Sequence, residues 1–291
     1  MAAFADDEDE YAEVTDEEKF AIASQILLQS PPGQIKEVLK DLKHLCSDEI
    51  LTDEAVAGVF HQYNNTMQQV IGPIICDEAT EIEDQVYIDP AAQTSVRVDP
   101  LHQKVEDADA SADFPLPEFP ADLQEYREAI EAAMNGYISK QFVPGTTTLS
   151  VVCGATDSEL LVILSGEKIN LKNYWSGRWR SRFIVSLEEK CLYGWVKINC
   201  HTFEDGNVQL STEKNVDDEA LSFDDPESLG AAVTDTISTI ESNVQESLED
   251  MYVNMSQEAF KDMRRALPIT RQKMDWSGAQ MQLAKGFGKS K

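Results

Sequence analysis

The stretch LGAAVTDTISTIESNVQESLEDM, residues 229–251, carries the strongest structural signal in the chain. Apolar residues recur along it at steps of three and four, which places them on one face of an α-helix. These residues are Leu229, Val233, Ile237, Ile240, Val244, Leu248 and Met251. The apolar pattern continues to Pro268, so we predict one helix over residues 228–267. Roughly 40 residues at about 1.5 Å each form a rod of about 60 Å, and we expect it to lie across a sheet and a second subunit.

The segment before this helix reads as one helix followed by strands. Residues 121–140 have a helical pattern. Strand-like segments follow at residues 146–152, 160–164, 182–187, 193–203 and 208–212. Asp205-Gly206 is typical of a hairpin turn between the last two, because glycine accepts the positive φ of a type I′ turn. Consecutive strands without intervening helices predict an antiparallel sheet within residues 121–227, and hence an α+β fold.

The N-terminal part predicts three short helices over residues 15–66, after an acidic arm at residues 1–14. Thr15 and Glu18 form a capping box at the start of the first helix. Helical spacing of apolar residues marks the second helix, and Thr52 or Asp53 can cap the third. Three amphipathic helices with tight links predict an antiparallel bundle.

Between this bundle and the predicted sheet, residues 67–120 predict a small β globule and a linker. Residues 85–88 and 94–98 read as short strands closed by Asp-Pro turns. Residues 104–120 are acidic and contain prolines, and we interpret them as the linker.

Charge is distributed unevenly along the chain. The formal net charge is -29, which excludes a generally basic protein that coats nucleic acid. From Lys261 to the end, however, eight bases face only two acids. An acidic body therefore ends in a basic C-terminal extension, residues 268–291, and in the basic turns just before it.

Five bases in this region predict an anion-binding patch: Lys261, Arg264, Arg265, Arg271 and Lys273. The first three share one helix face. Bases in the last helical turns also stabilise the helix dipole, and this alternative explains one or two of them. It does not reach Arg271 and Lys273, which lie beyond Pro268 and outside the predicted helix.

The sequence contains no complete motif for catalysis, metal binding or secretion. The final Gly286-Phe-Gly288-Lys289-Ser290 lacks the earlier glycine and the following helix of a phosphate-binding loop. The His–Cys neighbours lack zinc spacing. Five cysteines without a framework and an acidic N-terminus predict a reduced, cytoplasmic protein, and we expect no enzyme activity, cofactor or metal.

The block NYWSGRWRSR, residues 173–182, admits two interpretations. Trp175 and Trp179 with the three arginines could stack on bases and hold phosphates, as single-stranded nucleic-acid-binding proteins do. Alternatively, the tryptophans lie in a core or subunit interface and the arginines pair with local acids. We favour the second interpretation because no other basic stretch lies nearby, and we expect no nucleic-acid partner.

Several segments resemble the F-actin capping protein alpha subunit family. FKDMRRALPITR, residues 260–271, closely resembles its C-terminal signature, and FEDGNVQL, residues 203–210, resembles a second one. NYWSGRWRS, residues 173–181, matches a third block, and the helix at Thr15 followed by SPPG at 30–33 fits the family's opening. Order and spacing match over nearly the whole chain, with a poor match over residues 70–120.

The resemblance implies an obligate heterodimer with a capping protein beta subunit. Its stalk would come from N-terminal helices, and both chains would share an antiparallel sheet beneath their long helices. We expect the alpha chain to cap filament barbed ends without calcium and to block subunit addition and loss in the actin cytoskeleton. Acidic phosphoinositides and capping regulators can oppose this binding by family precedent.

The resemblance and the sequence pattern together assign roles to individual residues. Lys261, Arg265 and Arg271 match the family's actin-binding basic positions, and Arg264 and Lys273 join them on the charge argument. We assign a second set to the subunit interface: Trp175, Trp179, Ile237, Ile240, Val244 and Leu248.

Overall fold

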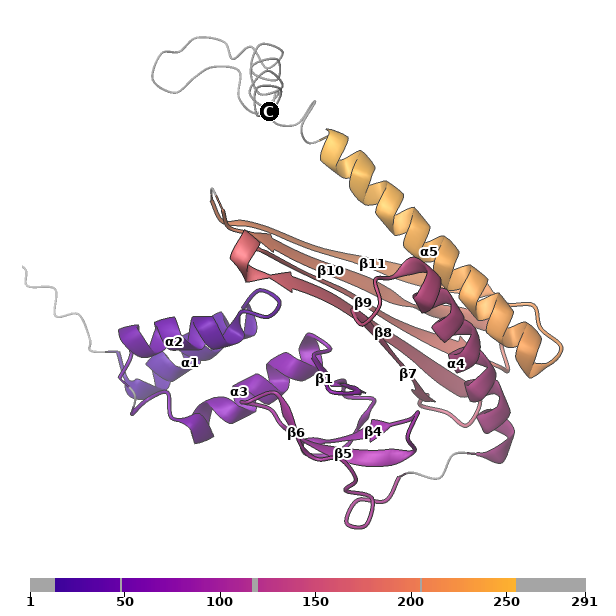
Figure 1. Ribbon diagram of the computed structural model, residues 1–291, viewed down its shortest axis with the longest axis horizontal. Helices are drawn as coiled ribbons and strands as arrows, with labels where there is room; N and C mark the ends of the chain where they lie inside the picture. The colour runs from indigo at the N-terminus through magenta and orange to yellow at the C-terminus, as the bar shows by residue number, and fades with distance from the viewer. Residues whose placement is uncertain (1–13, 48, 117–119, 205, 255–291) are drawn as a thin grey trace, which may run out of the picture. The chain divides into compact units, whose positions relative to one another are not determined.

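Three helices form the N-terminal part of the computed structural model, which describes residues 14–47, 49–116, 120–204 and 206–254. They are α1 (Asp16–Leu28), α2 (Ile35–Leu45) and α3 (Asp53–Thr66) (Figure 1). The capping box is confirmed: the Thr15 hydroxyl accepts from the Glu18 backbone N–H at 3.2 Å, and Glu18 accepts from Thr15 at 2.9 Å. Thr52 caps α3 as predicted. The three helices pack around one apolar core that includes Leu27, Phe60 and Tyr63.

A small β region follows α3. β1 (Val70–Ile71) and β2 (Ile74–Ile75) form a hairpin, and an antiparallel sheet contains β3 (Glu81–Glu83), β4 (Val86–Asp89), β5 (Thr94–Asp99) and β6 (Lys104–Asp107). The predicted strands at 85–88 and 94–98 are confirmed as β4 and β5. The linker predicted from residue 104 is wrong at its start, because β6 occupies that position. This edge strand pairs through its backbone and offers one apolar residue, Val105, so it leaves no alternating pattern.

The central sheet has five antiparallel strands in the order β11-β10-β9-β8-β7. They are β7 (Thr147–Cys153), β8 (Glu159–Asn170), β9 (Trp175–Ser186), β10 (Cys191–Thr202) and β11 (Val208–Ala220). All five predicted strands exist, but three are much longer than predicted: β8, β9 and β11. Their added residues are mostly polar, so the apolar pattern ends before the strand does. The predicted hairpin is confirmed by the antiparallel pairing of β10 with β11.

Different parts of the chain cover the two faces of this sheet. The segment after α3 covers one face, where the Ser165 hydroxyl donates to the Gln68 carbonyl at 2.8 Å. Helix α4 (Ala121–Gln141) lies along the other face (Figure 1). Phe142, just after α4, lines a hollow together with Trp179. The predicted helix at 121–140 is therefore confirmed, and the sheet is a layer between the N-terminal part and α4.

The long helix α5 spans Pro226–Asn254. The chain divides into two compact units, residues 1–236 and 237–291, and α5 runs from the first into the second. Its first turns pack on α4, where a Cβ at Gly230 would lie 2.6 Å from the Ala129 carbonyl oxygen. The predicted continuation from 255 to 267 lies outside the described residues. The α+β class, with an antiparallel sheet and a long C-terminal helix, is confirmed; the other domain boundaries and the placement across a partner stay predictions.

None of the helices in the described ranges is both long enough and apolar enough to span a membrane.

Candidate functional surfaces

The predicted anion-binding patch lies in the C-terminal region. Lys261, Arg264, Arg265, Arg271 and Lys273 fall outside the described residues, so their role stays a prediction. The structure does describe the helix before them. From residue 229 to 254, α5 carries acids and no base. The charge therefore changes sign between the end of described α5 and Lys261, which separates the patch from the acidic body along the chain.

The apolar stripe of α5 becomes more exposed toward its C-terminal end. Ile237, Ile240 and Val244 are buried. Leu248 is half-buried, whereas Met251 is 37% exposed. The predicted stripe is therefore confirmed as far as residue 254, and the last described turns of α5 present apolar surface. Assignment of these residues to a subunit interface stays a prediction.

Residues 175–182 of the Trp/Arg block form the first part of β9, and the strand places their side chains alternately on two faces. Successive side chains in a strand point to opposite faces of a sheet. Arg178, Arg180 and Arg182 therefore share one face, and Trp175 and Trp179 share the other. The arginines are on the face toward the segment after α3.

Arg178 is fully buried and hydrogen-bonded on several sides. Its Nη2 donates to the Glu167 carboxylate and, at 2.8 Å, to Gln69 Oε1. Its Nη1 donates to the Met67 carbonyl at 3.1 Å. This guanidinium therefore ties the segment after α3 to the sheet.

The next two arginines complete the same connection. Arg180 is buried and donates to the Thr66 carbonyl and, at 2.7 Å, to Asn199 Oδ1. Arg182 pairs with Asp77 at 3.2 Å. The interpretation that local acids pair with these arginines is confirmed for Arg178 and Arg182. The nucleic-acid interpretation is wrong for this block, because two of its three cations are buried against protein.

Burial shifts the proton affinities in this cluster. Burial, and then the neighbouring Arg178 charge, lower the pKa of Arg180 to about 10. Burial also raises the pKa of Tyr63 to about 12, although both arginines oppose that shift. The Tyr63 hydroxyl donates to the Pro31 carbonyl at 3.1 Å. Near neutral pH the charged Arg180 guanidinium therefore lies beside a neutral Tyr63 phenol.

The two tryptophans are half-buried on the opposite face of the sheet. Trp179 borders a hollow of about 240 Å³ together with Phe142, Ile198 and Cys200. Lys168 Nζ lies 5.8 Å from the Trp175 ring centroid, within the range of a cation–π contact. Both rings therefore keep part of their surface exposed, and the interface assignment stays a prediction.

An open sheet edge is a feature that sequence reasoning missed. Among the described residues β11 pairs with β10 alone, and most of its 13 residues are exposed. An edge strand presents unpaired backbone N–H and C=O groups that another strand can bind. Acids along β11, such as Glu213, Asp217 and Asp218, restrict which strand can do so. Only residues 208–212 have a strand-like sequence pattern, so the sequence does not predict the full length of this edge strand.

One cluster in the described part of the chain contains residue types that ligate metals: His61, Glu81 and Asp84, with ligand atoms within 4.8 Å of one another. His61 Nε2 lies 2.6 Å from Glu81, and its Nδ1 lies 3.4 Å from Asp84. Each ring nitrogen therefore faces a different carboxylate. The cluster therefore links α3 to the small sheet.

Comparison with known proteins gives a consistent result. Residues 23–285 match the family model described as F-actin capping protein alpha subunit. The chain is 31% identical to the F-actin-capping protein subunit alpha of Arabidopsis thaliana, covering 94% of this chain and 93% of that one. It is 28% identical to that of Neurospora crassa, covering 88% and 91%.

A solved structure shares the fold. It is the homodimeric actin capping protein alpha subunit from Plasmodium berghei, with a TM-score of 0.68 and 22% sequence identity. The match covers 87% of this chain and 98% of the other. The layers described above are therefore an arrangement already seen in a solved protein.

Proposed function

Because the chain belongs to the F-actin capping protein alpha subunit family, we propose that it caps actin filaments at their barbed ends as one subunit of a dimer. The match over residues 23–285 carries this proposal, since it includes the basic segment 260–271. Capping blocks subunit addition and loss by occupying the end. Capping requires stoichiometric binding. It needs neither catalytic turnover nor calcium, and it takes place in the cytoplasm on the actin cytoskeleton.

The partner in the proposed dimer is a capping protein beta subunit. Three features of this chain support a second subunit: the open edge of β11, the exposed end of the α5 stripe and the half-buried tryptophans. A partner strand beside β11 would extend the sheet through backbone hydrogen bonds. A second copy of this chain is the alternative, because the solved Plasmodium relative is homodimeric.

The proposed filament contact is electrostatic and local. The whole chain carries a formal charge of -29, so it repels an acidic filament at long range. Screening over about 8 Å at physiological salt lets a local basic patch dominate at contact. Lys261, Arg264, Arg265, Arg271 and Lys273 supply this patch. Acidic phosphoinositides and capping regulators would compete for the same charges.

Seeded elongation of actin filaments from their barbed ends tests the proposal. The chain purified with its beta subunit should stop elongation at stoichiometric occupancy, without added nucleotide beyond what actin needs. The triple variant Lys261→Ala, Arg265→Ala, Arg271→Ala should bind ends on the order of 100-fold more weakly, if each contact contributes about 1 kcal/mol.

A matched variant removes the same charge elsewhere: Lys36→Ala, Lys40→Ala, Lys43→Ala on α2. Lys36 donates to the His102 carbonyl at 2.8 Å, and Lys43 pairs with exposed Asp53 at 3.2 Å. These are surface contacts, so the fold should tolerate their loss. End affinity should stay within a few fold. Equal losses in the two triple variants would show that net charge, and not the patch, controls capping.

A further inference from the structure

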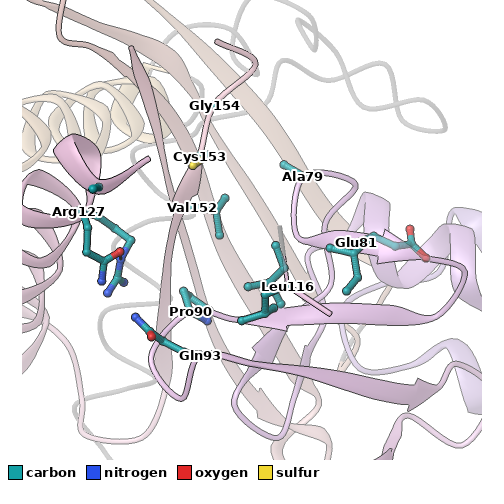
Figure 2. A pocket seen from close by; sticks show the side chains of 13 residues that line it. Ala79, Glu81, Pro90, Gln93, Leu116, Arg127, Val152, Cys153 and Gly154 are labelled. Carbon is teal, nitrogen blue, oxygen red and sulfur yellow. Dashed lines mark hydrogen bonds between the residues drawn. The ribbon is translucent and has the colours of Figure 1, made fainter. Parts of the chain in front are cut away.

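A cavity of about 680 Å³ lies where three parts of the fold meet. The small sheet, the first turns of α4 and the end of β7 each contribute a wall (Figure 2). Figure 2 shows Arg127 on one side and Ala79 and Glu81 on the other, with Leu116 and Val152 between them. None of these residues belongs to the surfaces proposed above for filament or subunit binding.

The cavity is half-open to solvent, and its size is that of a ligand site. Pockets for small molecules measure about 300–1,000 Å³. Water alone would need roughly 20 molecules to fill this one, at about 30 Å³ each. Much of the wall is apolar and is formed by Ile82, Ile88, Pro90, Leu116 and Val152, beside the polar side chains of Gln93 and Gln124.

The positive charge on the wall is already compensated. Arg127 is only 4% exposed. Its Nη1 donates to the Glu131 carboxylate at 2.6 Å, and its Nε donates to Gln124 Oε1 at 3.3 Å. An anionic ligand would have to displace Glu131 to pair with this guanidinium.

The carboxylate on the wall, Glu81, is already hydrogen-bonded to protein groups through both of its oxygens. One oxygen of Glu81 accepts from the Gln85 backbone N–H at 2.9 Å and lies 2.6 Å from His61 Nε2. The other oxygen accepts from Asn65 Nδ2 at 2.7 Å. A cationic ligand would therefore find a carboxylate whose oxygens are both engaged.

We propose that this cavity binds an uncharged, predominantly apolar small molecule. An ionised ligand would lose its water and would meet only charged groups that protein partners already bind, and such desolvation is strongly unfavourable. An apolar ligand gains from burial of its surface, about 25 cal/mol per Å². The amides of Gln93 and Gln124 and the thiol of Cys153 line the cavity, so one uncharged polar group on the ligand can also be accommodated.

Two fluorescent probes with nearly the same ring skeleton test whether a charged ligand binds more weakly than a neutral one. The measurement uses the full chain in the oligomeric state in which it purifies. Phenyl-naphthylamine is neutral, and anilinonaphthalene sulfonate carries one negative charge. The neutral probe should bind saturably at one site per chain. The sulfonate should bind at least about tenfold more weakly, because its charge must be desolvated. Equal affinities would overturn the proposal.

The position of the bound probe is tested at a cysteine. Bound phenyl-naphthylamine should slow alkylation of Cys153 by N-ethylmaleimide, read by peptide mass. Cys46, at the end of α2, is partly exposed and outside the cavity, so its alkylation should not change. Protection of neither cysteine, or of both equally, would place the probe elsewhere and refute the assignment.

A matched pair of variants closes the test. Ala121 is an exposed residue that lines the cavity. Ala121→Trp should block its mouth and weaken binding of the neutral probe at least about tenfold. A tenfold change corresponds to about 1.4 kcal/mol of lost contact. Ala132→Trp adds the same ring to an exposed position of α4 outside the lining and should leave binding unchanged. Equal effects of the two variants would contradict the site. None of these measurements depends on capping.

Discussion

At the scale of single residues, polar side chains hold the sheet to the N-terminal helices. Arg178 and Arg180 reach from β9 to backbone carbonyls at the end of α3 and just after it. Charged donors make strong hydrogen bonds, and a buried charge left without its partner is costly. The attachment of the two layers therefore depends on a few buried groups whose loss should be measurable.

Removal of the Arg178 guanidinium should destabilise the fold strongly. Breaking a buried ion pair costs about 3–5 kcal/mol. Glu167 is 25% exposed and can regain some water, so we expect Arg178→Ala to cost about 3 kcal/mol, near the lower end. Urea unfolding measures this loss. Lys197→Ala is the control, because its partner Glu213 is 48% exposed and such pairs contribute less than about 1 kcal/mol. Equal costs would contradict a structural role for Arg178.

A buried thiol should make the fold sensitive to alkaline pH. Burial is the largest cause that raises the pKa of Cys76, from 9.0 to about 12. The folded state therefore keeps this proton more tightly than the unfolded chain. Its contribution to stability is complete below pH 9 and is lost as pH rises toward 12.

Between about pH 8 and about pH 10, this group should lower the free energy of unfolding by roughly 1.5 kcal/mol. Cys76→Ala should remove most of that slope. Denaturant unfolding at the two pH values, for both proteins, measures it. An unchanged slope in the variant would assign the alkaline sensitivity to other groups, such as Tyr63.

At the scale of elements, α4 and the first turns of α5 approach closely at one glycine. A Cβ at Gly230 would lie 2.6 Å from the Ala129 carbonyl oxygen and 3.3 Å from the Ala133 Cβ. Backbone atoms cannot move aside as the end of a long side chain can. The absence of a side chain at residue 230 therefore sets the distance between the two helices.

Two glycine-to-alanine changes should act in opposite directions. Gly230→Ala should destabilise the fold by about 1–3 kcal/mol through overpacking, in spite of its better helix propensity. Gly136→Ala in α4 meets no atom within 4 Å and should stabilise the fold by about 0.5–1 kcal/mol. Thermal unfolding of both variants measures the shifts. A stabilised Gly230→Ala variant would show that the helices can separate at no cost.

At the scale of the whole molecule, the isolated chain has surfaces that suit a second chain. The open β11 edge and the exposed end of the α5 stripe both belong to this class. Exposed strand edges and apolar patches favour association in solution. Assembly is therefore expected to decide how the chain behaves after purification.

Expressed alone, the chain should aggregate or self-associate, whereas co-expression with a beta subunit should give a soluble complex with one copy of each. Light scattering coupled to size-exclusion chromatography measures both states. A cooperatively unfolding monomer of the lone chain would contradict the need for a partner. A stable homodimer would favour the arrangement named for the Plasmodium relative.

The sequence by itself was sufficient to predict the helices of the described residues. Capping at Thr15 and Thr52 and the periodic stripe of α5 depend on residues within a few positions of one another. Helix capping and one buried helix face produce a local pattern of polar and apolar residues, which can be recognised without knowing the rest of the chain. The same is true of the family, whose signature segments are contiguous.

Only the tertiary structure decided the full lengths of β8, β9 and β11, the roles of the arginines and the existence of the cavity. A strand is stabilised by its neighbouring strands. Apolar and polar residues alternate along it only where one face is buried and the other is exposed to solvent. On β9 both faces are largely covered and one bears arginines, so the pattern disappears although the strand continues. The partners of Arg178 lie 11 to 111 positions away along the chain, and no local rule can bring groups so distant into contact.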